Sequence, residues 1–330
     1  MLLCLGAVAL FAAAQAAALD RRALGLVVND SDPLSVEIGR YYAERRGITF
    51  QNVIRLAFAP GRPALGREEF DRLKRDADAQ AGPQVQAYAL AWALPYRVEC
   101  MSITSAFAFG YDPAYCEAGC GPTMPSRYFD SASHAPFSDF GMRPAMALAA
   151  RSLEEAKRLI DRGVASDGTR PEGTGYLLST SDARRNVRAQ FYPLAERVAH
   201  GRLQLRVVAQ DALMKRSDVL FYVTGVAVVS GLESLRFRPG ALADTLTSAG
   251  GMLDSGDGGH TTALRWLEAG ATASYGTVVE PCNRVQKFPH PAVLIARYLE
   301  GDTAIEAYWK SVQMPGQGVF AGEPLAAPYR

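Results

Sequence analysis

The sequence predicts an α/β protein with a mostly parallel sheet covered by helices on both faces. Short apolar runs rich in Val, Leu and Ala alternate along the chain with amphipathic stretches of helical spacing. Strands buried on both faces are apolar throughout, and a helix is the usual connection between parallel neighbours. Of the 330 residues, 48% are hydrophobic and 21% are charged, which is typical of a globular protein with a large core.

The first predicted unit is a strand, a turn and a helix. Residues 24–29 form an apolar run without helical spacing, and Asp32 and Pro33 precede an amphipathic stretch over 34–46. An Asp cap followed by Pro in the first turn is a common helix start. The same alternation continues to the end of the chain. Further strands are expected over 52–58, 85–95, 175–179, 204–209, 218–229 and 273–279, and further helices over 67–80, 145–162, 182–199, 261–269, 292–300 and 304–312.

Residues 99–142 interrupt this alternation with three cysteines and many Gly, Pro and aromatic residues. A loop of this length inside a compact protein is usually functional or cross-linked. We expect an N-terminal α/β region over 19–166 that contains the loop, and a C-terminal α/β region over 167–330. Two units and one continuous sheet fit the pattern equally.

Residues 1–18 are expected to be a cleavable signal peptide. Their apolar run ends in Ala16, Ala17 and Ala18, and the first charged side chain is Asp20. The alternative is an N-terminal membrane anchor, for which the run is barely long enough. No later stretch is continuously apolar for 18 residues, so we expect no membrane span after processing. The predicted location is the periplasm or the extracellular space.

The charge balance and the missing motifs exclude several classes of protein. With 35 basic and 34 acidic residues the net charge is +1, which argues against nucleic-acid binding. The sequence has no Gly-x-Gly-x-x-Gly, no phosphate-binding Gly-Lys-Ser/Thr loop, no His-Glu-x-x-His and no Cys-x-x-Cys. Neither a cofactor nor a metal ion is therefore predicted.

Four cysteines follow the predicted signal peptide, an even number that favours disulfides in an oxidising compartment. The close spacing of Cys116 and Cys120 favours a small loop between them, which leaves Cys100 to pair with Cys282. Two less favoured alternatives are a metal site and a catalytic thiol, involving His134, His260 and Cys282.

Polar side chains follow several predicted strands, where α/β proteins bind their ligands. The loops after 28, 95, 224 and 279 are therefore the places to expect chemistry. Residues 247–260 combine Ser, Asp and His with five Gly, and Glu280 directly follows a strand. The simpler interpretations are a turn that caps the next helix and an ion pair of Glu280 with Arg284 or Lys287. The weak catalytic candidates for a hydrolase are Ser248, Asp254, Asp257, His260 and Glu280.

A second hypothesis is a non-catalytic protein that binds a partner. Aromatic side chains on a cross-linked loop make a good contact surface. The partner would be an envelope or extracellular protein or ligand. The binding candidates are Phe107, Phe109 and Tyr111 in the loop, and Asp30 and Asp32 after the first strand.

Three blocks of sequence resemble a family of uncharacterised exported bacterial proteins. They are Asp32-Pro33-x-Ser35-x-x-Ile38-x-x-Tyr41-Tyr42, Glu280-Pro281-Cys282 and Gly322-Glu323-Pro324-Leu325. The resemblance extends over almost the whole chain after the signal peptide. It implies export and the α/β fold but no particular reaction.

The C-terminal half, from Asp218 onward, distantly resembles the gingipain and caspase-like cysteine peptidases. In those enzymes one strand ends in a catalytic His and the following strand ends in the nucleophilic Cys. The corresponding strands end here in Thr224-Gly225 and in Thr247-Ser248, without His or Cys. Since the thiol and the base that activates it are both missing, the resemblance does not carry over peptidase activity.

Overall fold

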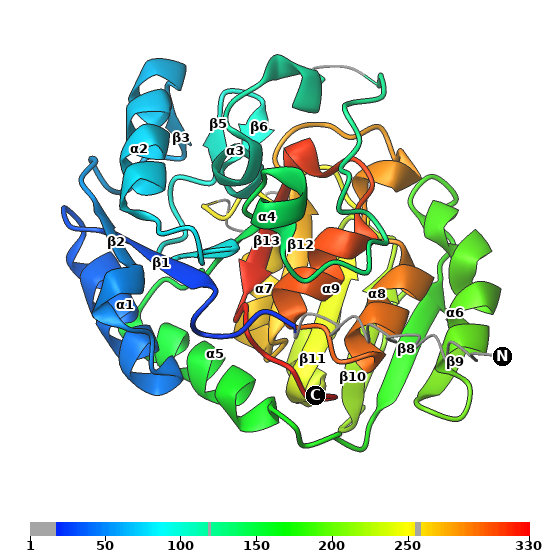
Figure 1. Ribbon diagram of the computed structural model, residues 1–330. Helices are drawn as coiled ribbons and strands as arrows, with labels where there is room; N and C mark the ends of the chain where they lie inside the picture. Colours follow the sequence, from blue (N-terminus) through cyan, green and yellow to red (C-terminus); the bar gives the residue numbers. More distant parts are fainter. Residues whose placement is uncertain (1–17, 118–119, 255–258) are drawn as a thin grey trace, which may run out of the picture.

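A ten-stranded sheet runs through the molecule and takes strands from both predicted regions (Figure 1). The computed structural model describes residues 18–117, 120–254 and 259–330. In these residues the strand order is β2-β1-β4-β7-β13-β12-β11-β10-β8-β9. The predicted α/β fold with a mostly parallel sheet is confirmed. The strands are β1 (Leu24–Asn29), β2 (Val53–Leu56), β4 (Ala87–Leu90), β7 (Ala145–Ala147), β8 (Thr174–Ser179), β9 (Gln204–Ala209), β10 (Val219–Thr224), β11 (Phe237–Thr245), β12 (Ala273–Thr277) and β13 (Gly318–Gly322).

The sheet consists of two parallel halves that run in opposite directions. Strand β12 is antiparallel to β13, with Tyr275 opposite Phe320, while the pairings on either side of this pair are parallel. The carboxyl ends of β1, β4 and β7 therefore lie at one edge, and those of β8, β10, β11 and β12 lie at the opposite edge. The loops that the sequence marks for chemistry are consequently divided between two edges of the sheet.

Helices cover both faces of each half (Figure 1). In the first half α1 packs on α5, and α2 and α3 lie on the other face. In the second half Phe221 of β10 contacts Tyr298 of α8, whereas its neighbour Tyr222 contacts Trp266 of α7. Successive side chains of a strand point to opposite faces, so α7 and α8 cover opposite faces. The helices are α1 (Pro33–Arg46), α2 (Arg67–Gln80), α3 (Ile103–Phe109), α4 (Pro136–Phe140), α5 (Leu153–Ser166), α6 (Tyr192–Ala199), α7 (Ala263–Ala269), α8 (Pro291–Leu299) and α9 (Ala304–Ser311).

Local signals place some elements correctly and others incorrectly. The side chain of Asp32 accepts a hydrogen bond from the backbone nitrogen of Leu34, and Pro33 begins α1 as expected. The helix expected over 145–162 is wrong in its first part, because residues 145–147 are strand β7, buried between β4 and β13. Its helix begins only at Leu153, after the cap Ser152.

The two disulfides that the fold contains do not have the expected pairing. Cys100 is bonded to Cys116 and Cys120 to Cys282, with Cα atoms 5.7 and 5.1 Å apart. The expectation of a Cys116–Cys120 pair was wrong because α3 turns the chain back on itself. That turn returns Cys116 to Cys100 and leaves Cys120 beside the end of β12, where Arg284 donates to its carbonyl at 2.9 Å.

One ion pair is completely enclosed between the second half of the sheet and the helices. Arg188 Nη1 lies 2.5 Å from Asp244 Oδ1, and the two side chains are 2% and 0% exposed. The guanidinium also donates to the carbonyl oxygens of Thr224 and Pro289. Arg188 thus connects β10, β11 and the segment before α8.

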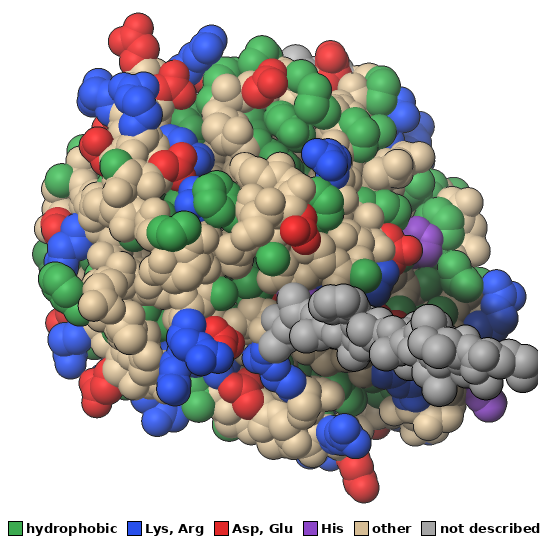
Figure 2. Space-filling view, viewed as in Figure 1, with side chains coloured by type: hydrophobic (Ala, Val, Ile, Leu, Met, Phe, Trp, Pro, Cys, Tyr) green, Lys and Arg blue, Asp and Glu red, His purple; other side chains and the backbone are tan. Residues whose placement is uncertain are grey.

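The surface carries both signs of charge. Basic and acidic side chains are interspersed on the face seen in Figure 2, in keeping with the near-neutral sequence. Among the described residues, no helix combines the length and the apolar character needed to cross a bilayer.

Candidate ligand-binding site

A cavity of about 520 Å³ lies beyond the carboxyl ends of β1, β4 and β7. Strand β1 has β2 on one side and β4 on the other, and helices α1 and α2 make the two connections. The chain therefore leaves the centre of this half in opposite directions, and such a switch point opens a crevice where α/β proteins bind ligands. The sequence could not show this, because the position depends on strand order.

The cavity has an apolar floor and a charged rim. Helix α1, the segment after β4 and the start of α7 supply most of the apolar groups. Of the described lining residues, none has a hydroxyl, thiol, imidazole or amine group. The floor and walls are formed by Leu34, Ile38, Pro60, Gly61, Ala91, Trp92, Ala93, Leu94, Ala150, Leu253 and Leu264, and the charged groups are Asp32, Arg151 and Asp254.

Trp92 is a buried polar group without a partner. It is 3% exposed, and its ring packs edge-on against Phe58 and Phe107 with centroids 5.2 and 5.9 Å apart. Its indole nitrogen has no hydrogen-bond acceptor among the described residues. A buried donor left unpaired costs about 1–3 kcal/mol. A ligand that offered an oxygen acceptor at this wall would remove that cost.

The rim of the cavity is acidic. The carboxylate of Asp32 caps α1, and Asp254 accepts a hydrogen bond from the hydroxyl of Tyr96. Burial, followed by this carboxylate, raises the pKa of Tyr96 to about 12, so the hydroxyl keeps its proton at neutral pH. Arg151 Nη1 lies 3.4 Å from Oε1 of Glu268, a carboxylate that also pairs with Arg265 at 2.6 Å. The rim thus carries two carboxylates and one guanidinium.

The two acidic residues predicted after β1 have different surroundings. Asp32 lines the cavity, as a binding residue would. Asp30 instead forms an exposed ion pair with Arg55, with 2.6 Å between Oδ1 and Nη1. The turn that carries both residues is held by Asn29. Its side-chain amide donates to the carbonyl of Phe58 and accepts from the backbone nitrogen of Phe58.

The predicted aromatic contact surface is largely internal. Phe107, predicted as a binding residue, is fully buried and offers no exposed surface to a partner. Helix α3 turns it inward onto Phe70. Phe109 is half-buried and stacks on Tyr115 with centroids 4.2 Å apart, and Tyr111 lies under the guanidinium of Arg67. These rings stabilise the cross-linked loop from within.

Of the hydrolase candidates, Asp254 lies at the cavity rim, whereas Ser248, His260 and Glu280 lie in the segments after β11 and β12. The backbone here is well fixed, since Thr277 Oγ1 donates to the carbonyl of Ser248 at 3.0 Å. His260 Nδ1 contacts the hydroxyl of Thr247, not Ser248. Glu280 is exposed and accepts from the backbone nitrogen of Cys282 at 2.7 Å. Asp257 lies outside the described residues, and within them no hydrogen bond joins Ser248 Oγ to His260.

His260 remains a neutral imidazole at pH 7. Burial, and then the nearby Arg185, lowers its pKa, while Glu280 opposes this. The hydroxyl that it contacts belongs to a fully buried residue, Thr247. A base next to an inaccessible hydroxyl does not present a nucleophile to a substrate.

We therefore expect no labelling of Ser248 by a fluorophosphonate probe, which reacts with serine nucleophiles activated by a base. The measurement is mass spectrometry of the purified protein after prolonged exposure, with a trypsin-like hydrolase as the positive control. Labelling of Ser248 that disappears in His260→Gln would contradict the expectation and establish the dyad.

His134, named above as a less favoured metal candidate, lies in a cluster with two carboxylates that the sequence did not mark. Ligand atoms of His134, Asp302 and Glu306 lie within 4.8 Å of one another. Their oxygens already accept hydrogen bonds, from Lys310 to Asp302 and from Thr303 to Glu306. We interpret the cluster as a network of buried charges.

Comparisons with family models, with curated proteins and with solved structures returned no match. The chemistry of this molecule therefore has to be argued from its own side chains. Of the places that the sequence marks, the cavity at β1, β4 and β7 combines an apolar lining with charged groups at its mouth. This cavity is therefore the candidate ligand-binding site.

Proposed function

We propose that this chain is an exported, non-catalytic binding protein that takes a small amphipathic cation into the cavity at the ends of β1, β4 and β7. The observation that carries the proposal is the combination of an apolar floor, an unpaired indole N–H and two carboxylates at the mouth. Pockets of this size with a few polar groups are typical of small-molecule sites.

The floor and the rim of the cavity would contact different parts of a ligand. Apolar groups of a ligand would leave water for the floor formed by residues such as Ile38 and Leu264, which gives about 25 cal/mol per Å² of buried apolar surface. A positive group at the other end would face Asp32 and Asp254. A carboxylate there would be repelled, so the rim selects the sign of charge.

Two observations support export. Cystine bridges persist in oxidising compartments and are rare in the cytosol, and this chain has two. An apolar run ending in small residues precedes Leu19. Together they favour removal of residues 1–18 and a location of the mature protein in the periplasm or outside the cell.

Binding is tested with the neutral fluorescent probe N-phenyl-1-naphthylamine, which we expect to brighten in the cavity. Decylamine should displace it about five-fold more effectively than decanol, because the ammonium adds an attraction to partly exposed carboxylates. The Asp32→Asn, Asp254→Asn double variant should lose this difference. Asn caps a helix as well as Asp does, so α1 is preserved.

Two matched variants serve as controls. Asp30→Asn changes a neighbouring carboxylate outside the cavity and should keep the preference for decylamine. Ala93→Trp should fill the cavity and abolish probe binding. Unchanged probe binding in Ala93→Trp would contradict the site, and equal displacement by decylamine and decanol in the wild type would contradict its preference for cations.

A further inference from the structure

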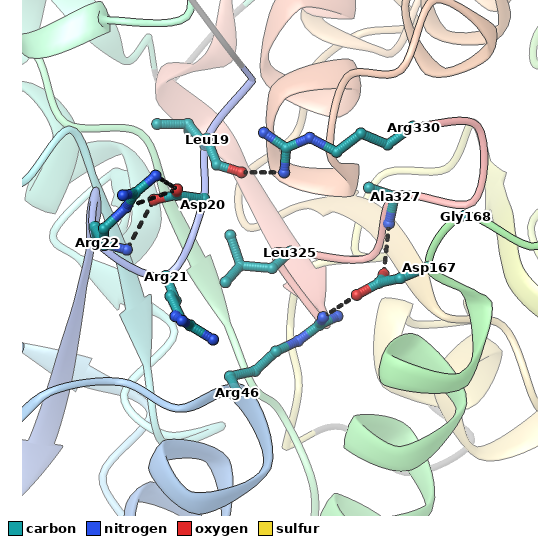
Figure 3. Close-up of a pocket in the computed structure, with 10 residues that line it drawn as sticks. All are labelled: Leu19, Asp20, Arg21, Arg22, Arg46, Asp167, Gly168, Leu325, Ala327 and Arg330. Atoms are coloured by element: carbon teal, nitrogen blue, oxygen red, sulfur yellow. Dashed lines mark hydrogen bonds and ion pairs between the residues drawn. The ribbon is translucent and has the colours of Figure 1, made fainter.

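The segment that follows the predicted cleavage point is fixed inside the fold. The side chain of Leu19 is 1% exposed and packs in a hydrophobic core cluster. Its carbonyl accepts from Arg330 Nη1 at 3.2 Å, and the same guanidinium contacts the carbonyl of Ala18. Figure 3 shows Leu19 beside Arg330 at a cavity of about 620 Å³. Packing and the C-terminal arginine thus hold Leu19 in one position.

The backbone nitrogen of Leu19 faces a buried carboxylate. It lies 3.2 Å from Oε2 of Glu306, a side chain that is 0% exposed. The same oxygen accepts from the nitrogen and the hydroxyl of Thr303 at 3.0 and 2.7 Å, and Oε1 lies 2.7 Å from His134 Nδ1. Of these donors, the nitrogen of Leu19 is the one that changes chemically if the preceding peptide bond is cut.

Two buried carboxylates and one lysine lie together around Glu306 in the intact chain. Asp302 is also buried, and its Oδ2 lies 2.9 Å from Nζ of Lys310, which is 1% exposed. Two buried carboxylates therefore share one buried ammonium, with the partly exposed His134 beside them. Burial, and then Glu306, raises the pKa of Asp302 to about 6. The described network thus has one lysine and one imidazole for its two carboxylates.

We infer that hydrolysis of the bond between Ala18 and Leu19 creates an α-ammonium that forms a buried ion pair with Glu306 and completes this network. Water adds across the bond, the new carboxylate departs on Ala18, and the Leu19 amine takes up a proton. Two positive charges then face two carboxylates. The mature chain therefore has a larger free energy of unfolding than its precursor.

This inference rests on the processing that belongs to the proposed function, but it is independent of the ligand cavity. The competing occupant of the cluster is a divalent metal ion held by His134, Asp302 and Glu306. A metal ion would displace Lys310 and Thr303 from oxygens that they already occupy, whereas the ammonium replaces an existing N–H donor. The hydrogen bonds thus favour the ammonium.

The test compares two chains with both disulfides formed, each released from an N-terminal fusion. One chain begins at Leu19 and the other at Ala18. We expect the unfolding equilibrium constant in urea to be at least about ten-fold smaller for the Leu19 chain, because the extra residue displaces the ammonium from a buried partner. Glu306→Gln should remove the difference. Glu37→Gln, an exposed glutamate, should retain it.

A second measurement does not depend on the folding of the Glu306 variant. At pH 6.5 an amine-acetylating reagent should modify the α-amine of the native Leu19 chain about ten-fold more slowly than that of the Ala18 chain, since a buried amine reacts only when the structure opens. Equal stabilities and equal rates would overturn the ion pair. So would Zn²⁺ binding by the Leu19 chain that Glu306→Gln abolishes.

Sequencing the N-terminus of the exported protein tests the processing step separately from the ion pair. A first residue of Leu19 supports both. Another first residue contradicts processing at this bond and with it the physiological role of the ion pair, whereas the two purified chains still decide whether the ammonium pairs with Glu306.

Discussion

Arg188→Met should lower the free energy of unfolding by about 3–5 kcal/mol at neutral pH. The change leaves the carboxylate of Asp244 buried without its cation, and it removes the guanidinium as a donor to the carbonyls of Thr224 and Pro289. Breaking one side of a buried pair has costs of this size, because the remaining charge cannot reach water. Equilibrium urea unfolding, followed by tryptophan fluorescence without reductant, measures the loss.

Two comparisons isolate the cause of that loss. Arg184→Met removes an exposed arginine from the same segment and should change the stability by less than about 0.5 kcal/mol. Adding Asp244→Leu to Arg188→Met should return the stability to within about 1 kcal/mol of the wild type, since an apolar pair replaces the ionic one. A double variant less stable than Arg188→Met would contradict the explanation.

The loss should also depend on pH with a defined sign. Burial raises the pKa of Asp244 even with Arg188 beside it, so removing Arg188 raises it further. A carboxyl whose folded pKa exceeds its unfolded value destabilises the fold when both states are ionised, and this effect fades as the pH falls. The deficit of Arg188→Met should therefore shrink between pH 7 and about pH 4.

Replacing Cys120 and Cys282 together by Ser should cost about 5 kcal/mol, against about 3 kcal/mol for the Cys100 and Cys116 pair. The first bridge closes a loop with a sequence separation of 162 residues and the second one of 16, so the first restricts the unfolded chain more. Urea unfolding of the two double variants measures the difference. Equal losses would show that the bridges act mainly by local contacts in the folded state.

The parts of the fold that short-range signals determine were predictable. The Asp32 cap and Pro33 specify the start of α1 through contacts within a few residues. Strand β7 was missed because the buried run Ala145-Met146-Ala147 is short and lacks β-branched residues. The direction of β13 and the cysteine pairing depend on how distant segments meet, and neither leaves a local pattern.

The candidate site was predictable only in part. Asp32 and Asp254 were both marked, the first for binding and the second for catalysis, and they meet at the rim of one cavity. Trp92 carries no motif, and what marks it is an indole nitrogen that has no acceptor among the residues described. Phe107 has the composition of a contact residue, but the geometry of α3 places it in the core.

The reversal between β12 and β13 sends the carboxyl ends of the two halves to opposite edges of the sheet. The bridge from Cys120 to Cys282 follows the end of β12, whereas the cavity lies beyond β1, β4 and β7. Asp254 comes after β11 and still reaches the rim of the cavity, so one segment of the chain belongs to both edges.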